Sequence, residues 1–130
     1  MSSRRTILRG LGATLAAAAA PAPLLAQAKY PSRPITLVVA YAAGGGTDAI
    51  ARVFAAKLEQ RLGASVVVEN PPGAGGNLAT DAVAGARPDG YTLLIGNQGP
   101  MVVNPHLFAS MRSDPEKTLD PVCLIAVAPS

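Results

Sequence analysis

Tryptophan is absent from the 130-residue sequence, which has only five aromatic residues and a single cysteine. One cysteine excludes an intramolecular disulfide, and with one histidine it supplies too few soft ligands for a structural zinc site. Cys123 lies within the apolar run 122–127. We therefore expect it to be a small buried side chain rather than a nucleophile or a redox sensor.

Charged residues are also scarce. They make up 15% of the chain, whereas 49% of the residues are hydrophobic, and a disordered chain would show the opposite balance. Three of the eleven basic residues, Arg4, Arg5 and Arg9, lie in the first ten positions. The remainder therefore has eight basic and eight acidic residues and no net charge. A neutral body offers no clustered basic face, and nucleic acid is not an expected partner.

Residues 1–28 have the pattern of an export signal. A basic start precedes the apolar stretch 11–20, Pro21 and Pro23 break any helix, and a small-x-small site predicts cleavage after Ala28. The apolar stretch is shorter than the roughly 20 residues of a membrane span. Residues 3–9 resemble a twin-arginine motif, although an ordinary secretory signal is the alternative. No cysteine marks a lipid anchor, so we predict a soluble periplasmic protein without a membrane anchor.

The remainder alternates between strand and helix patterns, which predicts an α/β fold with a parallel sheet. Apolar runs rich in β-branched residues predict buried strands at 35–41, 65–69 and 91–95. Helices are expected at 47–62 and 78–86, the second capped by Asn77, with one helical turn near 105–108. A further strand-like run begins at 119 and continues to 127. Because nothing covers that run, we interpret the sequence as truncated. The buried face of the first helix is predicted to consist of Ile50, Val53, Phe54, Leu58 and Leu62.

Two glycine-rich loops connect these strands to the following helices, at 42–48 and 71–77. In open parallel sheets, ligands bind at the carboxyl ends of the strands. Glycine permits close approach to the backbone, and the first amides of a helix are unpaired and lie at the positive end of its dipole. Two such ends can hold an anion without lysine or arginine. Each loop could equally be a purely structural turn.

Neither loop carries a nucleotide motif. Both lack the Gly-Lys-Ser/Thr of a P-loop, and Leu78 stands where a dinucleotide fingerprint needs Gly or Ala. Asp48 could orient a ligand group or simply stabilise its helix, Tyr41 could line a pocket or pack, and Asn97 and Gln98 could bind ligand or shape a turn. No catalytic constellation or metal site can be assembled. The candidate ligand-binding residues are Tyr41, Ala43, Gly44, Gly45, Gly46, Thr47, Asp48, Gly73, Ala74, Gly75, Gly76, Asn77, Asn97 and Gln98.

The order of these motifs resembles a known family. Tyr-Pro-Ser-Arg-Pro-Ile at 30–35, Gly-Gly-Gly-Thr-Asp at 44–48, Pro-Gly-Ala-Gly-Gly-Asn at 72–77 and Pro-Asp-Gly-Tyr-Thr-Leu-Leu at 88–94 resemble the Bug-type substrate-binding proteins of tripartite tricarboxylate transporters. Two positions depart from the family pattern. Ala40 stands where Pro is usual, and Pro71 precedes Pro72 where Arg-Pro is usual.

The resemblance implies a two-lobed periplasmic binding protein, of which residues 29–130 would be the amino-terminal part of the first lobe. It implies a small carboxylate ligand held by the two loops, no cofactor, no enzymatic activity, a monomer, and membrane transport subunits or a sensor as partners. Two other readings stay open at this point. One is a truncated gene product without its own function, and the other is a small α/β enzyme that uses the loops for a phosphate or cofactor.

Overall fold

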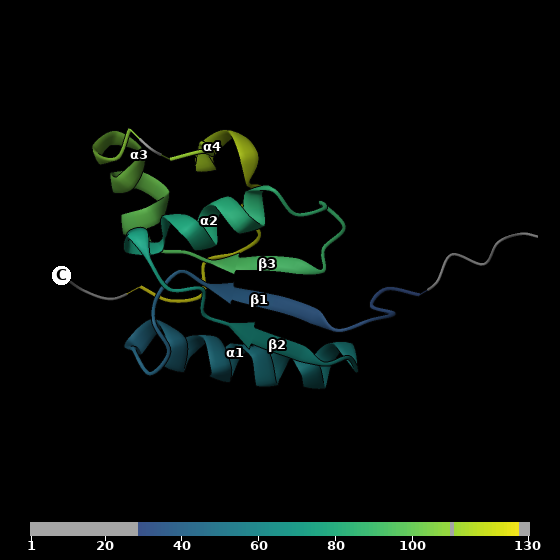
Figure 1. The fold of residues 1–130 in the computed structure, drawn as a ribbon. Coiled ribbons are helices and arrows are strands. Elements are labelled where there is room, and N and C mark those ends of the chain that lie inside the picture. Colours follow the sequence, from purple (N-terminus) through teal and green to yellow (C-terminus); the bar gives the residue numbers. More distant parts are fainter. Residues whose placement is uncertain (1–28, 110, 128–130) are drawn as a thin grey trace, which may run out of the picture.

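The fold is a three-stranded parallel sheet with helices on both faces, in a computed structural model that describes residues 29–109 and 111–127. The predicted export signal and its cleavage site lie outside these residues. The strands are β1 (Ile35–Val39), β2 (Val66–Glu69) and β3 (Thr92–Ile95), arranged in the order β2-β1-β3. The arrowheads in Figure 1 point the same way, so all three carboxyl ends meet at one edge. The predicted α/β class with a parallel sheet is confirmed.

The sheet has two separate cores because alternate residues of β1 face opposite sides. On one face, Ile35, Leu37 and Val39 pack with Ala51 and Ala55 of helix α1 (Gly46–Leu62). On the other face, Val38 and Ala40 pack with Ala79 and Val83 of helix α2 (Asn77–Ala84). The two helices therefore cover opposite faces (Figure 1). The chain reverses its direction of winding at β1, which makes the end of β1 a topological switch point.

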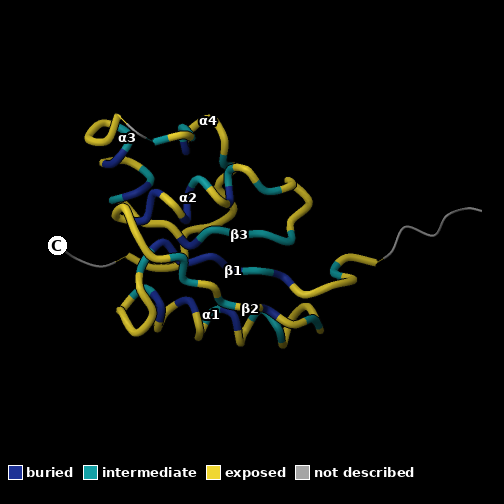
Figure 2. Tube along the Cα trace, in the orientation of Figure 1, coloured by how far each residue is buried: buried dark blue, intermediate teal, exposed yellow. Residues whose placement is uncertain are grey.

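The prediction for the buried face of α1 was wrong in part. Ala51 and Ala55 are its buried apolar residues, whereas Ile50 and Val53 are 45% and 66% exposed. Phe54 and Leu58 are half-buried against the core. Figure 2 shows buried, intermediate and exposed residues alternating along α1. The helix contacts the sheet through its alanines because small side chains allow close approach. A prediction based on the spacing of large apolar residues does not reveal this contact.

The helix boundaries follow from local chemistry. Helix α1 ends where predicted, at Gly63, which has a φ of 65° and donates its N–H to the Glu59 carbonyl. Helix α2 ends at Ala84, two residues earlier than predicted. Its N-cap is Gly76 rather than the predicted Asn77, which is instead the first helical residue.

The segment after β3 is helical in short pieces. A π-helical turn η2 (Gly99–Val103) leads into α3 (Asn104–Leu107), and α4 (Pro115–Thr118) follows. The strand predicted from residue 119 does not form within the described residues 119–127. Cys123 in that stretch is exposed, which corrects the prediction of a buried thiol. Cys123 is not buried because residues 119–127 do not pair with the sheet.

Candidate functional site

Three chain segments meet at the carboxyl edge of the sheet, one after each strand. We call them the first loop (residues 40–45, after β1), the second loop (residues 70–73, leading into the tight turn η1, Ala74–Gly76) and the third segment (residues 96–98, after β3). Every predicted ligand-binding residue lies in these segments or in the first turn of the helix that follows. The parallel sheet thus brings together residues that are up to 57 positions apart, counted from Tyr41 to Gln98.

The first loop is organised around the carboxylate of Asp48, which is 3% exposed. Its Oδ2 accepts hydrogen bonds from the Gly44 N–H and from Arg52 Nε, both at 2.9 Å. Its Oδ1 accepts from Asn70 Nδ2 at 3.1 Å, and the same amide group donates to the Tyr41 carbonyl at 2.9 Å. Asp48 therefore joins the first loop to the second loop instead of pointing a free carboxylate at solvent.

These contacts keep Asp48 ionised. Hydrogen bonds from Arg52 and from the Gly44 N–H lower the pKa of its carboxyl from 3.8 to about 2. The same pairing raises the pKa of the Arg52 guanidinium. At neutral pH the pair is a formed ion pair with no net charge.

The second loop runs into a left-handed turn. Gly73, Ala74, Gly75 and Gly76 have φ values of 121°, 50°, 61° and 94° in succession. Ala74 is the non-glycine residue of this run, and that conformation costs an L-residue about 1–2 kcal/mol. At Gly76, a Cβ atom would lie 2.8 Å from the Ala40 carbonyl oxygen, so only glycine fits against the end of β1. Backbone strain of this kind is often found at functional sites.

Four further hydrogen bonds hold the turn and the third segment in place. Buried Asn104, at the start of α3, donates from Nδ2 to the Gly75 carbonyl at 3.0 Å and to Asn77 Oδ1 at 2.6 Å. The Tyr41 hydroxyl donates to Asn97 Oδ1 at 2.7 Å, and the Gly99 N–H donates to the same oxygen at 3.0 Å. Tyr41 thus ties the end of β1 to the end of β3.

Exposure divides the predicted residues into two groups. Residues 43–46 and 73–75 and the side chains of Asn97 and Gln98 are open to solvent, and Thr47 and Tyr41 are half-buried. Gly76, Asn77 and Asp48 are buried beneath them. The open group can touch a ligand directly, whereas the buried group supports the loops.

The start of α1 offers free hydrogen-bond donors. Its N-cap is Gly45, with φ −79° and ψ 170°, and no side chain caps the first turn. The Gly44 N–H donates to the Asp48 carboxylate, and the Ala49 N–H donates to the Gly45 carbonyl. The amides of residues 45–47 lie between these two, at the positive end of the helix dipole and beside open glycines. Such an arrangement suits an anionic group.

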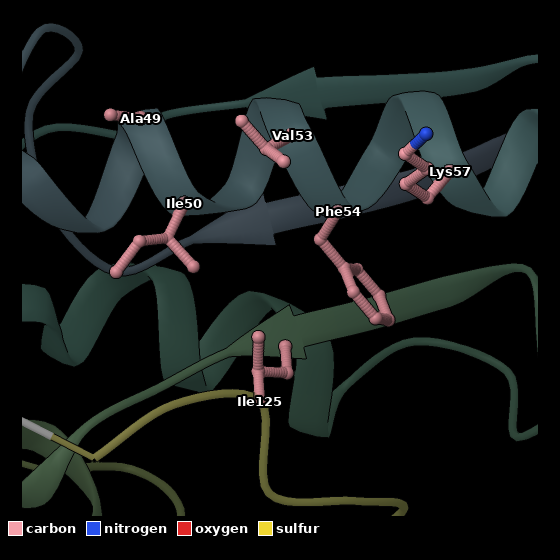
Figure 3. A pocket seen from close by; sticks show the side chains of 6 residues that line it. All are labelled: Ala49, Ile50, Val53, Phe54, Lys57 and Ile125. Atoms are coloured by element: carbon pink, nitrogen blue, oxygen red, sulfur yellow. The ribbon is translucent and has the colours of Figure 1, made fainter.

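A groove elsewhere on the surface has different chemistry. It is a groove of about 480 Å³ along the side of α1, lined by Ala49, Ile50, Val53, Phe54, Lys57 and Ile125 (Figure 3). Five of these six side chains are apolar, and the groove is not at the strand ends. The uncapped backbone donors lie at the loops instead, away from this groove. Over residues 29–109 and 111–127, no cluster of His, Cys, Asp or Glu is suited to hold a metal ion.

Sequence reasoning missed Asn70, Arg52 and Asn104. A signal for Asn70 existed, since a polar residue directly after a parallel strand occupies the same edge as Tyr41 and Asn97. Arg52 lies one helical turn after Asp48, a spacing at which opposite charges pair. Asn104 carried no signal, because its contact depends on how the π-helical turn folds back over the second loop.

The sequence is similar to that of known proteins. Residues 50–130 match the family described as tripartite tricarboxylate transporter family receptor. A UPF0065 protein of Bordetella bronchiseptica is 44% identical over 126 residues, covering 96% of this chain and 36% of that protein. Protein BugT of Bordetella pertussis is 40% identical over 124 residues, covering 95% of this chain and 38% of that protein. The chain thus spans about a third of the length of these relatives.

Two solved structures from Rhodopseudomonas palustris share the fold. MatC with bound malate superposes with a TM-score of 0.71 at 42% identity, covering 74% of this chain and 33% of that one. A protein solved with adipate gives a TM-score of 0.64 at 41% identity, covering 67% of this chain and 29% of that one. Within residues 29–109 and 111–127, no helix has both the length and the apolar character needed to cross a membrane.

Proposed function

Because this chain belongs to the tripartite tricarboxylate transporter receptor family, we propose that the whole protein is a periplasmic solute-binding protein that captures a small carboxylate. One observation carries the proposal. The uncapped start of α1 follows the first loop, and the exposed glycine turn at residues 73–75 leads into Gly76, which packs against the Ala40 carbonyl at the end of β1. The neighbours solved with malate and with adipate support the ligand class. Di- or tricarboxylates, acidic amino acids and aromatic acids all fall within it.

In this proposal the protein binds and releases its ligand without catalysing a reaction. The first-turn amides of α1, together with the Thr47 hydroxyl and the amide side chains of Asn97 and Gln98, donate hydrogen bonds to one carboxylate. Gly44 acts differently from its neighbours, because its N–H is engaged by Asp48 and its role is to shape the loop. The remaining length of the protein supplies the second lobe, closes over the ligand and presents it to membrane transport subunits or a sensor. Residues 1–28 are the export signal, cleaved after Ala28.

The first experiment asks whether the complete mature protein binds carboxylates at all. Malate, adipate, citrate, aspartate and benzoate are titrated while the melting temperature is followed, with the matching neutral amides as controls. A true ligand at 100 times its Kd stabilises the folded state by about 2.7 kcal/mol. If no acid in the panel raises the melting temperature above its neutral amide, the proposed function is wrong.

A second experiment tests whether the α1 amides hold the ligand. Gly46 is the first residue of α1, and its predecessor has extended backbone angles that are compatible with a following proline. Proline is tolerated at this position of a helix, so Gly46→Pro removes one N–H donor while the helix is kept. We expect carboxylate affinity to fall at least about tenfold, as for a lost hydrogen bond to a charged group. The matched control is Gly46→Ala, which keeps the donor and meets no atom within 4 Å. Equal affinities for the two variants would place the ligand elsewhere.

A further inference from the structure

The proposed anion site has an acidic residue built into it. Asp48 is buried, stays ionised at neutral pH, and bonds directly to the first loop through the Gly44 N–H. It follows the proposed donor amides of residues 45–47 in the chain. A negative charge at this position opposes the binding of an anion. Something must therefore offset this charge.

Arg52 is placed to do so. Its Nε donates to Asp48 Oδ2 at 2.9 Å from one helical turn along α1, and its Nη2 lies 3.5 Å from Asn70 Oδ1. The Asn70 amide nitrogen donates hydrogen bonds to Asp48 Oδ1 and to the Tyr41 carbonyl. The three side chains thus form one closed hydrogen-bonded unit that spans both loops. The Arg52 side chain is 55% exposed, whereas that of Asp48 is 5% exposed.

We propose that Arg52 is a positioning residue of the carboxylate site: it cancels the charge of Asp48 beside the bound anion and, with Asn70, fixes the first and second loops relative to each other. This inference rests on the proposed function. The ligand's carboxylate is held by backbone amides, and Arg52 acts on it through Asp48. The planar guanidinium contacts two partners from one side chain, which the single ammonium of a lysine does not reproduce.

The charge part of the proposal is tested with malate and the complete mature protein. Arg52→Gln leaves the Asp48 charge uncompensated, so we expect malate affinity to fall about tenfold, with the loss shrinking as salt is raised. Arg52→Lys keeps the charge but not the two-partner contact, so it should lose less malate affinity than Arg52→Gln without matching the wild type. The double variant Asp48→Asn, Arg52→Gln removes both charges and should recover most of the affinity that Arg52→Gln loses. Arg61→Gln, an exposed arginine in the last turn of the same helix, is the control and should bind like the wild type.

The pattern across variants separates this role from a merely structural one. If Arg52 only supported the fold, removing its partner as well would deepen the loss instead of reversing it. A double variant as weak as Arg52→Gln, or an Arg52→Gln protein that binds malate like the wild type, overturns the charge part of the proposal.

Hydrogen exchange of the ligand-free protein tests the loop-fixing part and needs no ligand. We expect faster amide exchange at residues 42–47 and 70–75 in Arg52→Gln than in Arg61→Gln, and unchanged exchange in β1. Equal loop exchange in the two variants overturns this part. If the wild type binds none of the panel acids, the proposed function has failed, and the exchange comparison alone then decides whether Arg52 fixes the loops.

Discussion

At the scale of single residues, the site is built by side chains that bond to backbone. Asp48, Asn70 and Asn104 each hold a main-chain N–H or carbonyl of a loop in place. The loops themselves are mostly glycine and carry few side chains of their own. Buried amide and carboxylate groups therefore define the shape of a surface that presents backbone donors.

Asp48 gives a pH prediction whose sign is fixed by the direction of its pKa shift. The folded pKa, about 2, lies below the ordinary value of 3.8, so ionisation of Asp48 favours the folded state. Its contribution to stability is complete above about pH 4 and is lost as pH falls toward 2. We expect the unfolding free energy of the wild type to drop more steeply across this window than that of Asp48→Asn, measured by urea denaturation at each pH.

The comparison between the two proteins isolates Asp48 from other acids. Asp89 and Asp114 also have lowered pKa values, from a hydrogen bond donated by the Tyr91 N–H and from Lys117 respectively, but they are present in both proteins. Parallel pH profiles for the wild type and Asp48→Asn would contradict the Asp48–Arg52 ion pair.

At the scale of elements, the order of strands and helices could be predicted from the sequence, but helix packing could not. Continuous β-branched runs identified all three strands to within two residues, since a strand buried on both faces has no polar side. The apolar residues of α1 fit a helix but misidentified its inner face, because Ala51 and Ala55 contact the sheet. The loops were correctly placed as connections, whereas the Asp48–Arg52–Asn70 unit depends on the relative position of β1 and β2.

The inner face of α1 can be tested with two alanines of the same helix. Ala51 is fully buried, so Ala51→Leu must displace the sheet or the helix and should destabilise the protein by about 1–3 kcal/mol. Ala56 is exposed, and Ala56→Leu should stay within about 0.5 kcal/mol of the wild type. Denaturant unfolding measures both. Similar losses for the two variants would mean that α1 does not pack through its alanines.

At the scale of the whole molecule, the proposed site is an open edge of the described residues rather than an enclosed cavity. The first loop and the glycine turn form an open edge, and residues 42–46 are all exposed. Small-molecule binding pockets usually bury most of the ligand, on the order of 70–90% of its surface. An open edge of this kind could offer a carboxylate hydrogen bonds but would leave the rest of the ligand in water. The two relatives are roughly two and a half times as long as this chain.

If these loops hold the carboxylate as proposed, affinity should still depend on the whole protein. We expect residues 29–130 alone to bind malate, or whichever panel acid the complete protein prefers, at least about 100-fold more weakly, because the ligand stays largely solvated on one side. Calorimetric titration of both proteins measures the ratio, after circular dichroism has verified that the shorter one is folded. Gly46→Pro provides the internal control, since it should weaken binding by a similar factor in both if the same amide is used in each. If residues 29–130 bind within tenfold of the affinity of the complete protein, this prediction is wrong. The backbone donors of the loops would then account for nearly all of the binding free energy without enclosure of the ligand.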